Sequence, residues 1–188
     1  MKDKKEKKIL QAALNLFIER GFHDTPTSLI AKKADVATGT LFHYFKSKED
    51  LINELYLDAK NSLFQELIKE IGEETPDEEK LELLWMNLVK CGLKSPREFK
   101  FYQQFSNSPF ITNLTHEQIS NQCEFLKQII NKLLKKGIFK TLDIGYIMDY
   151  FYGHCITTIS HLINHPEKVN QENLDKYYQF CWDGIMKR

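Results

Sequence analysis

Residues 25–51 read TPTSLIAKKADVATGTLFHYFKSKEDL, and they decide the fold of the first part of the chain. Thr25 followed by Pro26 predicts an N-cap and the first residue of a helix, because proline suits the first helical turn. The apolar residues that follow keep helical spacing for only about two turns, so this helix is expected to be short. Residues 35–37 leave room for no more than a tight turn, and the aspartate that opens it tolerates a left-handed backbone. A second short helix is then expected over residues 38–45.

Longer helices are expected on both sides of this stretch. Before it, residues 9–17 place apolar side chains at helical spacing, and Gly21 supplies a C-terminal stop. After it, Ser47 is a candidate N-cap with two acidic residues at the positive end of the helix dipole. The apolar stripe of that helix extends for about five turns through Leu51, Leu55, Ala59, Leu63 and Leu67.

Five further helices are predicted in the rest of the chain. Residues 72–79 combine Gly, Thr and Pro with acidic side chains and are the best candidate for a linker. Ser95-Pro96-Arg97-Glu98 and Thr115-His116-Glu117-Gln118 have the pattern of capping boxes that open helices. The five helices are expected over residues 81–93, from residue 96, and over 115–137, 142–164 and 174–186. About nine helices in total make the expected fold class all-α.

Composition and charge support two domains along the chain. The 188 residues are 42% hydrophobic, and 23 aromatic side chains against eight Gly and five Pro favour long helices. Residues 1–48 carry ten basic and five acidic side chains, a net charge of +5, whereas the remainder carries 16 basic and 21 acidic, a net charge of −5. We expect a basic domain over residues 1–60 and a helical body over residues 61–188. The basic segment suits a polyanion, although a solvated Lys-rich end is the alternative.

Several classes of protein are disfavoured. The N-terminus lacks the apolar core of a secretory signal, and no run of about 18 apolar residues is present, so we expect a cytoplasmic protein without a membrane partner. The four cysteines stand singly and are expected to be buried thiols rather than zinc ligands or disulfides. An enzyme is the main competing class, but no nucleophile with base, Gly-rich phosphate loop or zinc signature is visible, so we expect no catalytic residues and no cofactor.

The two short helices with their tight turn, braced by the preceding helix, form a helix-turn-helix pattern. Its second helix can lie in the major groove of DNA while the turn and the other helices fix its angle. A simple helical hairpin in a bundle would show the same periodicity.

The residues go further than the pattern. The segments 9–17 (ILQAALNLF), 19–22 (ERGF) and 39–51 (GTLFHYFKSKEDL), together with Thr25, Ile30-Ala31 and Val36, resemble the signature of the tetracycline-repressor (TetR) family. The resemblance covers roughly the first fifty residues. It implies an N-terminal three-helix DNA-binding domain, a C-terminal helical bundle, and a regulator that represses transcription and responds to a ligand.

By this resemblance residues 38–44 form the recognition helix, which a homodimer would place in successive major grooves of a palindromic operator in double-stranded DNA. Hydroxyl and cationic groups suit phosphates, whereas Ser28, Thr38 and His43 suit base edges. Leu41 and Phe45 are expected to pack inward. The expected DNA-binding residues are Thr27, Ser28, Thr38, Gly39, Thr40, Phe42, His43, Tyr44 and Lys48.

Two residues depart from the family pattern and bear on the angle of the recognition helix. Asp35 stands where the family usually has Gly, and Ala37 stands where a Ser often caps the recognition helix. The lysines between Lys2 and Lys8 either form a solvated tail or reach a phosphate or the minor groove.

The resemblance assigns the C-terminal body to an unidentified small-molecule inducer and to dimerisation. An inducer releases DNA only if it binds the non-DNA state more tightly. The ligand-pocket hypothesis groups apolar and polar side chains that could equally be core residues: Trp85, Leu88, Tyr102, Phe105, Phe125, Tyr150, Phe151 and His154.

Dimerisation is expected on two long helices, over residues 146–162 and 174–185, where the small Gly153 would allow close approach. His161 and His165 have the i, i+4 spacing of metal ligands and share a helical face with His154, but no carboxylate or thiol joins them convincingly, so no metal is expected. A helical adaptor that uses its helix-turn-helix for protein contacts is the remaining alternative.

Overall fold

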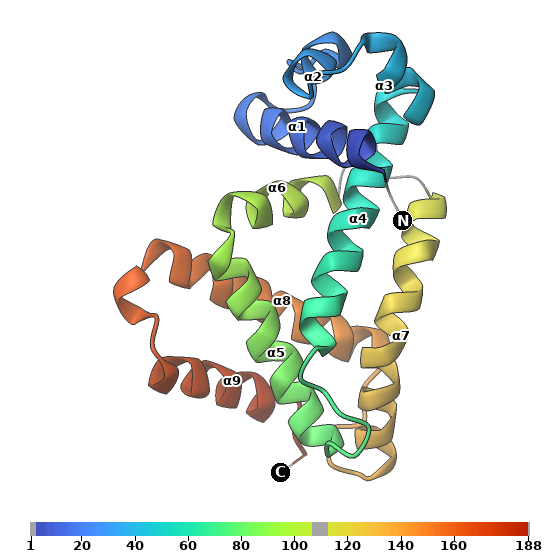
Figure 1. Ribbon diagram of the computed structural model, residues 1–188. Helices are drawn as coiled ribbons and strands as arrows, with labels where there is room; N and C mark the ends of the chain where they lie inside the picture. Colours follow the sequence, from blue (N-terminus) through green and yellow to red (C-terminus); the bar gives the residue numbers. More distant parts are fainter. Residues whose placement is uncertain (1–2, 107–112, 188) are drawn as a thin grey trace. The chain divides into compact units, whose positions relative to one another are not determined.

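The structure, a computed structural model, describes residues 3–106 and 113–187, and in these ranges the chain is helical (Figure 1). A single isolated bridge between Phe139 and Met186 is the one strand-like pairing in the described ranges. The all-α prediction is confirmed. The helices are α1 (Lys4–Arg20), α2 (Thr27–Lys33), α3 (Thr38–Tyr44), α4 (Lys48–Ile68), α5 (Asp77–Lys94), α6 (Pro96–Ser106), α7 (Asn113–Lys135), α8 (Ile144–Asn164), a 3-10 turn (Pro166–Lys168) and α9 (Gln171–Ile185).

The helices divide into two compact units. One consists of Met1–Lys60 and Arg97–Gln118, and the other of Asn61–Pro96 and Ile119–Arg188. The chain therefore leaves the first unit within α4, returns to it at the start of α6 and leaves it again within α7.

In the first unit, α1, α2 and α3 pack on one another (Figure 1). Gly21 ends α1 as predicted, with a φ of 78° that suits glycine. The predicted N-cap at Thr25 is wrong, because α2 begins at Thr27 with Pro26 in the cap position. The fully buried Thr25 hydroxyl instead donates to the Gly21 carbonyl, 2.7 Å away. It thereby satisfies one of the carbonyls left without a partner at the end of α1.

The turn between α2 and α3 has the expected backbone. Asp35 has a φ of 57°, so the aspartate that replaces the usual glycine adopts the left-handed conformation. The Val36 N–H donates to the Ala31 carbonyl over 3.0 Å and closes the turn. Ala37 takes the N-cap position of α3 without a side-chain hydrogen bond. Leu41 and Phe45 are buried, which confirms that this face of α3 packs inward.

Two further features complete the first unit. The Ser47 hydroxyl accepts a hydrogen bond from the Asp50 N–H over 3.0 Å, as predicted for the cap of α4. The aromatic side chains of α6 pack against α1. The rings of Phe17 and Phe101 are stacked, with their centres 6.2 Å apart and an angle of 5° between their planes. The Phe105 ring lies 4.3 Å from that of Phe101. Buried aromatic surface thus attaches α6 to the helix-turn-helix.

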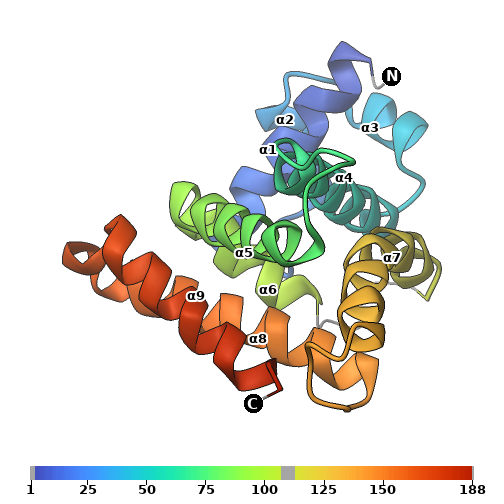
Figure 2. The same ribbon diagram turned by 90° about the horizontal axis from the view of Figure 1, so that it is seen from below.

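In the second unit, α5 packs against α8 and α9, and α8 also packs against α9 (Figure 2). Trp85 is fully buried at the centre of this core. Four helix starts differ from the predictions, that of α8 by two residues, since it begins at Ile144. The linker ends at residue 76, since Asp77 already belongs to α5. The helix that was expected to be capped by Thr115 begins at Asn113, and α9 begins at Gln171 with Asn170 as its cap.

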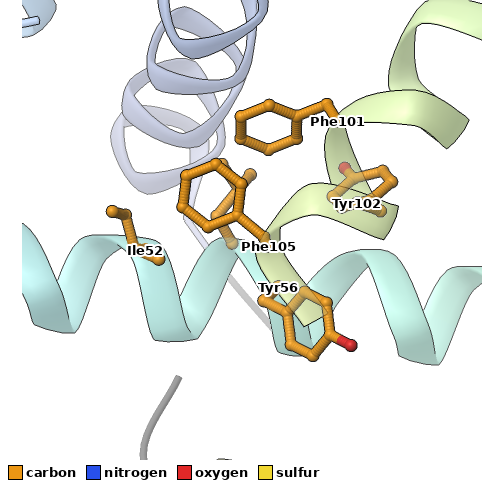
Figure 3. A pocket seen from close by; sticks show the side chains of 6 residues that line it. Ile52, Tyr56, Phe101, Tyr102 and Phe105 are labelled. Carbon is orange, nitrogen blue, oxygen red and sulfur yellow. The ribbon is translucent and has the colours of Figure 1, made fainter. Parts of the chain in front are cut away.

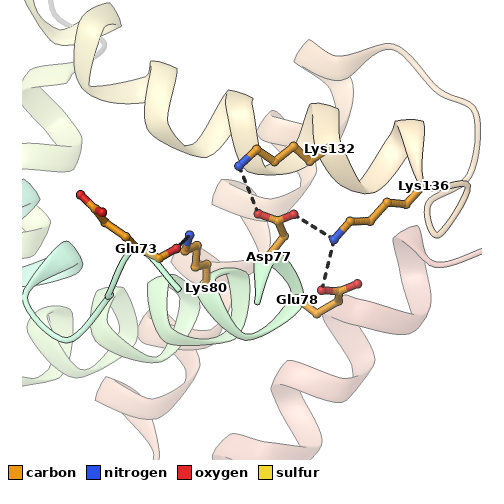
Figure 4. A network of polar contacts seen from close by, with 6 residues as sticks. All are labelled: Glu73, Asp77, Glu78, Lys80, Lys132 and Lys136. Atoms are coloured by element: carbon orange, nitrogen blue, oxygen red, sulfur yellow. Dashed lines mark hydrogen bonds and ion pairs between the residues drawn. The ribbon is translucent and has the colours of Figure 1, made fainter. Parts of the chain in front are cut away.

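An ionic cluster ties the start of α5 to the end of α7 (Figure 4). The Asp77 carboxylate lies 2.9 Å from the Lys136 ammonium and 3.6 Å from that of Lys132, and Lys136 also lies 3.9 Å from Glu78. Burial acts to raise the pKa of Asp77, but the hydrogen bond from Lys136 and the charges of Lys132 and Lys136 together lower it below its usual value. Acidic residues in the first turn of α5 therefore act as partners of α7 as well as of the helix dipole.

The cysteines follow the prediction in part. Cys155 and Cys181 are buried thiols, and burial raises the pKa of Cys181 to about 12. Cys91 is only half-buried and Cys123 is exposed, so the expectation of burial is wrong for these two.

Candidate nucleic-acid interface

The outer face of α3 is open to solvent. Thr38, Gly39 and His43 are exposed, and Phe42 keeps 43% of its surface accessible. The helix is only seven residues long, and its inner face is held by the buried Leu41. A short helix that is braced on one side and open on the other has the dimensions to enter a major groove. Of the two predicted residues on α2, Ser28 is exposed and Thr27 is half-buried.

Tyr44, the last residue of α3, is engaged by a residue that the sequence analysis did not single out. Its hydroxyl donates to a carboxylate oxygen of Asp3, the N-cap of α1. The hydrogen bond from Tyr44 lowers the pKa of Asp3, and the same bond raises the pKa of Tyr44. The capping position of Asp3 was readable from the sequence, whereas its contact with a residue 41 positions later was not.

Lys48, at the start of α4, also makes contacts inside the unit. Its ammonium donates to the Phe22 carbonyl and lies 4.1 Å from the centre of the Phe22 ring. Partial burial lowers the pKa of Lys48. Both contacts are with Phe22, which lies in the connection between α1 and α2. An ammonium group has three donors, and the bond to the Phe22 carbonyl uses one of them.

The predicted ligand-pocket residues fall in different places. Tyr102 and Phe105 lie on α6 in the first unit, where they line an apolar pocket together with Ile52, Leu55, Tyr56 and Phe101 (Figure 3). Burial raises the pKa of the Tyr102 hydroxyl. Phe125, in the second unit, packs edge-on against Phe64 with ring centres 6.4 Å apart.

The other five predicted residues belong to α5 and α8 in the second unit. Leu88 and Phe151 are buried core residues. The Trp85 indole N–H donates to Nδ1 of His154 over 3.2 Å, so the neutral His154 carries its proton on Nε2. The Tyr150 ring lies 6.3 Å from His154. Burial lowers the pKa of His154.

The surface of α8 and α9 exposes large aromatic side chains. Phe180 is 70% exposed and Tyr146 is 62% exposed, with Tyr152 also on the surface. An added Cβ at Gly153 would meet no atom of the other described residues within 4 Å, its chain neighbours and the adjoining helix backbone aside. The rings of His161 and His165 lie 4.6 Å apart, and Nδ1 of His165 is 3.5 Å from a Glu167 carboxylate oxygen. Among the residues that the structure describes, no three side chains form a group that could hold a metal ion.

None of the helices in the described ranges is long and apolar enough to cross a membrane.

Comparison with known protein families gives matches along nearly the whole chain. Residues 9–55 match the model of the bacterial regulatory proteins of the tetR family, and residues 56–187 match a tetracyclin repressor-like C-terminal domain. A fatty acid metabolism regulator protein of Bacillus subtilis is 32% identical over 145 residues, which cover 76% of this chain and 68% of the relative.

Solved structures share the fold. A TetR-family transcription regulator from Shewanella sp. PV-4 superposes with a TM-score of 0.91 at 28% identity, covering 99% of this chain and 100% of that one. The transcriptional regulator FadR from Bacillus subtilis, solved in complex with stearoyl-CoA, superposes with a TM-score of 0.70 at 22% identity, covering 94% and 95% of the two chains.

Proposed function

Because this chain belongs to the TetR family of DNA-binding transcriptional regulators, we propose that it binds a palindromic operator as a homodimer and represses transcription until a small molecule releases it. It is a regulator and not an enzyme. Its place of action is then the cytoplasm, where bacterial DNA is accessible. In this proposal residues 1–60 bind DNA and residues 61–188 bind the second subunit, while the ligand is bound by residues of both ranges, in α4 and α6.

The open outer face of α3 is the observation that carries the proposal for DNA. Thr38, Gly39, Phe42 and His43 would face base edges, with Ser28 beside them from α2. Donors at the margins of this face, Thr27, Thr40, Tyr44 and Lys48, would contact phosphates. The exposed lysines 32, 33 and 46 add positive charge near the same helices.

The proposed dimer uses the exposed aromatic side chains of α8 and α9. Exposed aromatic surface of this kind is typical of a protein interface, and two copies of this helix pair would form a four-helix contact about a twofold axis. Phe180→Glu should give a monomer in analytical ultracentrifugation. Gln171→Glu, an exposed position nine residues before Phe180 and so on the opposite side of the same helix, is the matched control and should leave the dimer intact. A dimeric Phe180→Glu protein would exclude this face.

The proposed effector is a molecule with an apolar tail. Support comes from the similarity to a fatty acid metabolism regulator and from the apolar side chains between α4 and α6, which fill the space between these helices, so that a ligand enters only by displacing α6. The pocket residues Phe101 and Phe105 also pack against Phe17 of α1, so a ligand that displaces α6 would act directly on the DNA-binding helices. Long-chain acyl-CoA is the first compound to test, because FadR was solved with stearoyl-CoA.

The experiment that tests the function is selection of bound duplexes from a random DNA library, followed by salt titration of the selected site. A palindrome whose affinity falls steeply with salt supports a dimeric operator-binding regulator. Stearoyl-CoA is then added to the complex, and release of the duplex supports induction. A folded protein that selects no common site with or without stearoyl-CoA would refute the proposal.

A further inference from the structure

Asp3 makes two separate sets of contacts with its two carboxylate oxygens. Oδ1 accepts hydrogen bonds from the backbone N–H groups of Lys5 and Glu6, at 2.8 and 2.9 Å, and so caps α1. Oδ2 accepts the hydroxyl proton of Tyr44 at the end of α3. One side chain therefore joins the first turn of α1 to the last turn of the proposed recognition helix.

The capping role requires only one oxygen atom. Asparagine and serine cap helices about as well as aspartate, because the cap is a hydrogen bond to the N–H groups of the first turn. The second oxygen and the full negative charge of Asp3 are not needed to begin α1. The bond to Tyr44 uses the second oxygen, while the charge of Asp3 also interacts with Lys5 and with the positive end of the α1 dipole.

Tyr44 has a single hydroxyl proton to donate. A phosphodiester oxygen accepts hydrogen bonds and does not donate them, and the same is true of an ionised carboxylate. The Tyr44 hydroxyl can therefore donate a full hydrogen bond to Asp3 or to a DNA phosphate, but not to both at once. A phosphate that approaches Tyr44 would also be repelled by the negative charge of Asp3.

We propose that Asp3 competes with the DNA backbone for the Tyr44 hydroxyl, and thereby limits the affinity of this chain for DNA. This inference rests on the proposed function, because it takes Tyr44 to be a phosphate contact. The partner is a phosphodiester group of duplex DNA. Release of Tyr44 from Asp3 accompanies binding, and the lysines that follow Asp3 in α1 supply positive charge at the same turn.

Asp3→Asn tests the competition with little change in shape. The asparagine oxygen keeps the cap of α1, and its amide can donate to the Tyr44 oxygen, which leaves the hydroxyl proton free for a phosphate. We expect the operator Kd at low salt to fall by roughly tenfold, the size typical of one hydrogen bond to a charged group. In a Tyr44→Phe background the same substitution should give a much smaller gain.

Glu6→Gln is the matched control, because it removes a carboxylate of the same helical turn that acts on Tyr44 through its charge and not through a hydrogen bond. If Glu6→Gln tightens binding as much as Asp3→Asn, net charge explains the effect and the inference is overturned. The inference is also overturned if Asp3→Asn, with an unchanged melting temperature, binds the operator no more tightly than the wild-type protein.

Titration of the free protein separates this inference from the proposed function. The Asp3 contact raises the pKa of Tyr44, so tyrosine absorbance should show one hydroxyl titrating at lower pH in Asp3→Asn, and this difference should vanish in the Tyr44→Phe background. If no such difference is found, the contact is absent and the inference fails, whatever the protein does with DNA. A wild-type protein that binds no duplex refutes the proposed function instead.

Discussion

Replacing Gly92 by alanine should destabilise the second unit, although the change improves helix propensity. Gly92 is buried in α5, and a Cβ built there would lie 2.7, 2.8 and 3.0 Å from three side-chain carbons of Ile159 in α8. Alanine in a helix interior is favoured over glycine by about 1 kcal/mol. Against this gain stands an overlap with a β-branched side chain that is fully buried and has few rotamers available.

The steric cost should exceed the gain in propensity. Overpacking of a filled core typically costs about 1–3 kcal/mol, and the three short distances in α5 and α8 place Gly92→Ala in the upper part of that range. The net loss in the free energy of unfolding is then about 1–2 kcal/mol. Truncation of the partner, Ile159→Ala, should itself cost about 2–5 kcal/mol, but the added methyl group should cost much less in that background.

Urea unfolding followed by tryptophan fluorescence is a suitable assay, because Trp85 and Trp182 both lie in the second unit. Gly153→Ala is the matched control. Its Cβ would meet no side chain of the described residues within 4 Å, its chain neighbours aside, so at a dilution where the protein is monomeric the substitution should stabilise by about 0.5–1 kcal/mol. A Gly92→Ala protein as stable as the wild type, or a penalty that persists unchanged with Ile159→Ala, would refute the reasoning.

Three further predictions concern ionisable groups. Burial lowers the pKa of His154, so the contribution of this residue to stability is complete above about pH 6.5 and is lost as the pH falls through its lower folded-state pKa. The urea midpoint should therefore fall on acidification. It should fall less in His154→Asn, which keeps a hydrogen-bond acceptor for Trp85. Lys48→Met should reduce the slope of log affinity against log salt by about one if its remaining donors reach a phosphate, and an unchanged slope would restrict Lys48 to its contacts with Phe22. Asp77→Asn removes the ion pairs with Lys132 and Lys136 and should lower the melting temperature by roughly 2 °C. This difference should vanish in about 1 M salt. A difference in melting temperature that persists at high salt would argue against an ionic cause.

Local signals in the sequence were sufficient for most helix ends. Gly21, Asp35 and Ser47 act within a few residues of their own positions, so their roles were readable from neighbouring letters. Thr25 was misassigned because a hydroxyl beside a proline suits an N-cap, whereas the carbonyl it bonds belongs to the preceding helix. The acidic residues before position 80 suggested a linker, although acids are equally favoured in the first helical turn.

Contacts between distant residues could not be read in this way. The bond from Tyr44 to Asp3 joins positions 41 apart, and that from Lys48 to Phe22 joins positions 26 apart. Hydrophobic periodicity identified the aromatic face of α6 but could not show that it packs against Phe17. Periodicity reports which side of a helix is buried and not which other helix covers it.

The return of the chain to its first unit has a consequence for protein engineering. Regulators with separate DNA-binding and ligand-binding domains can be recombined, with the DNA-binding domain of one protein fused to the ligand-binding domain of another. A cut after Lys60 would separate α1 from the α6 segment that belongs to the same compact unit, and would leave Phe17 facing the α6 of a foreign protein. A functional chimera of this chain should therefore carry Arg97–Gln118 together with its first sixty residues, as two grafts instead of one.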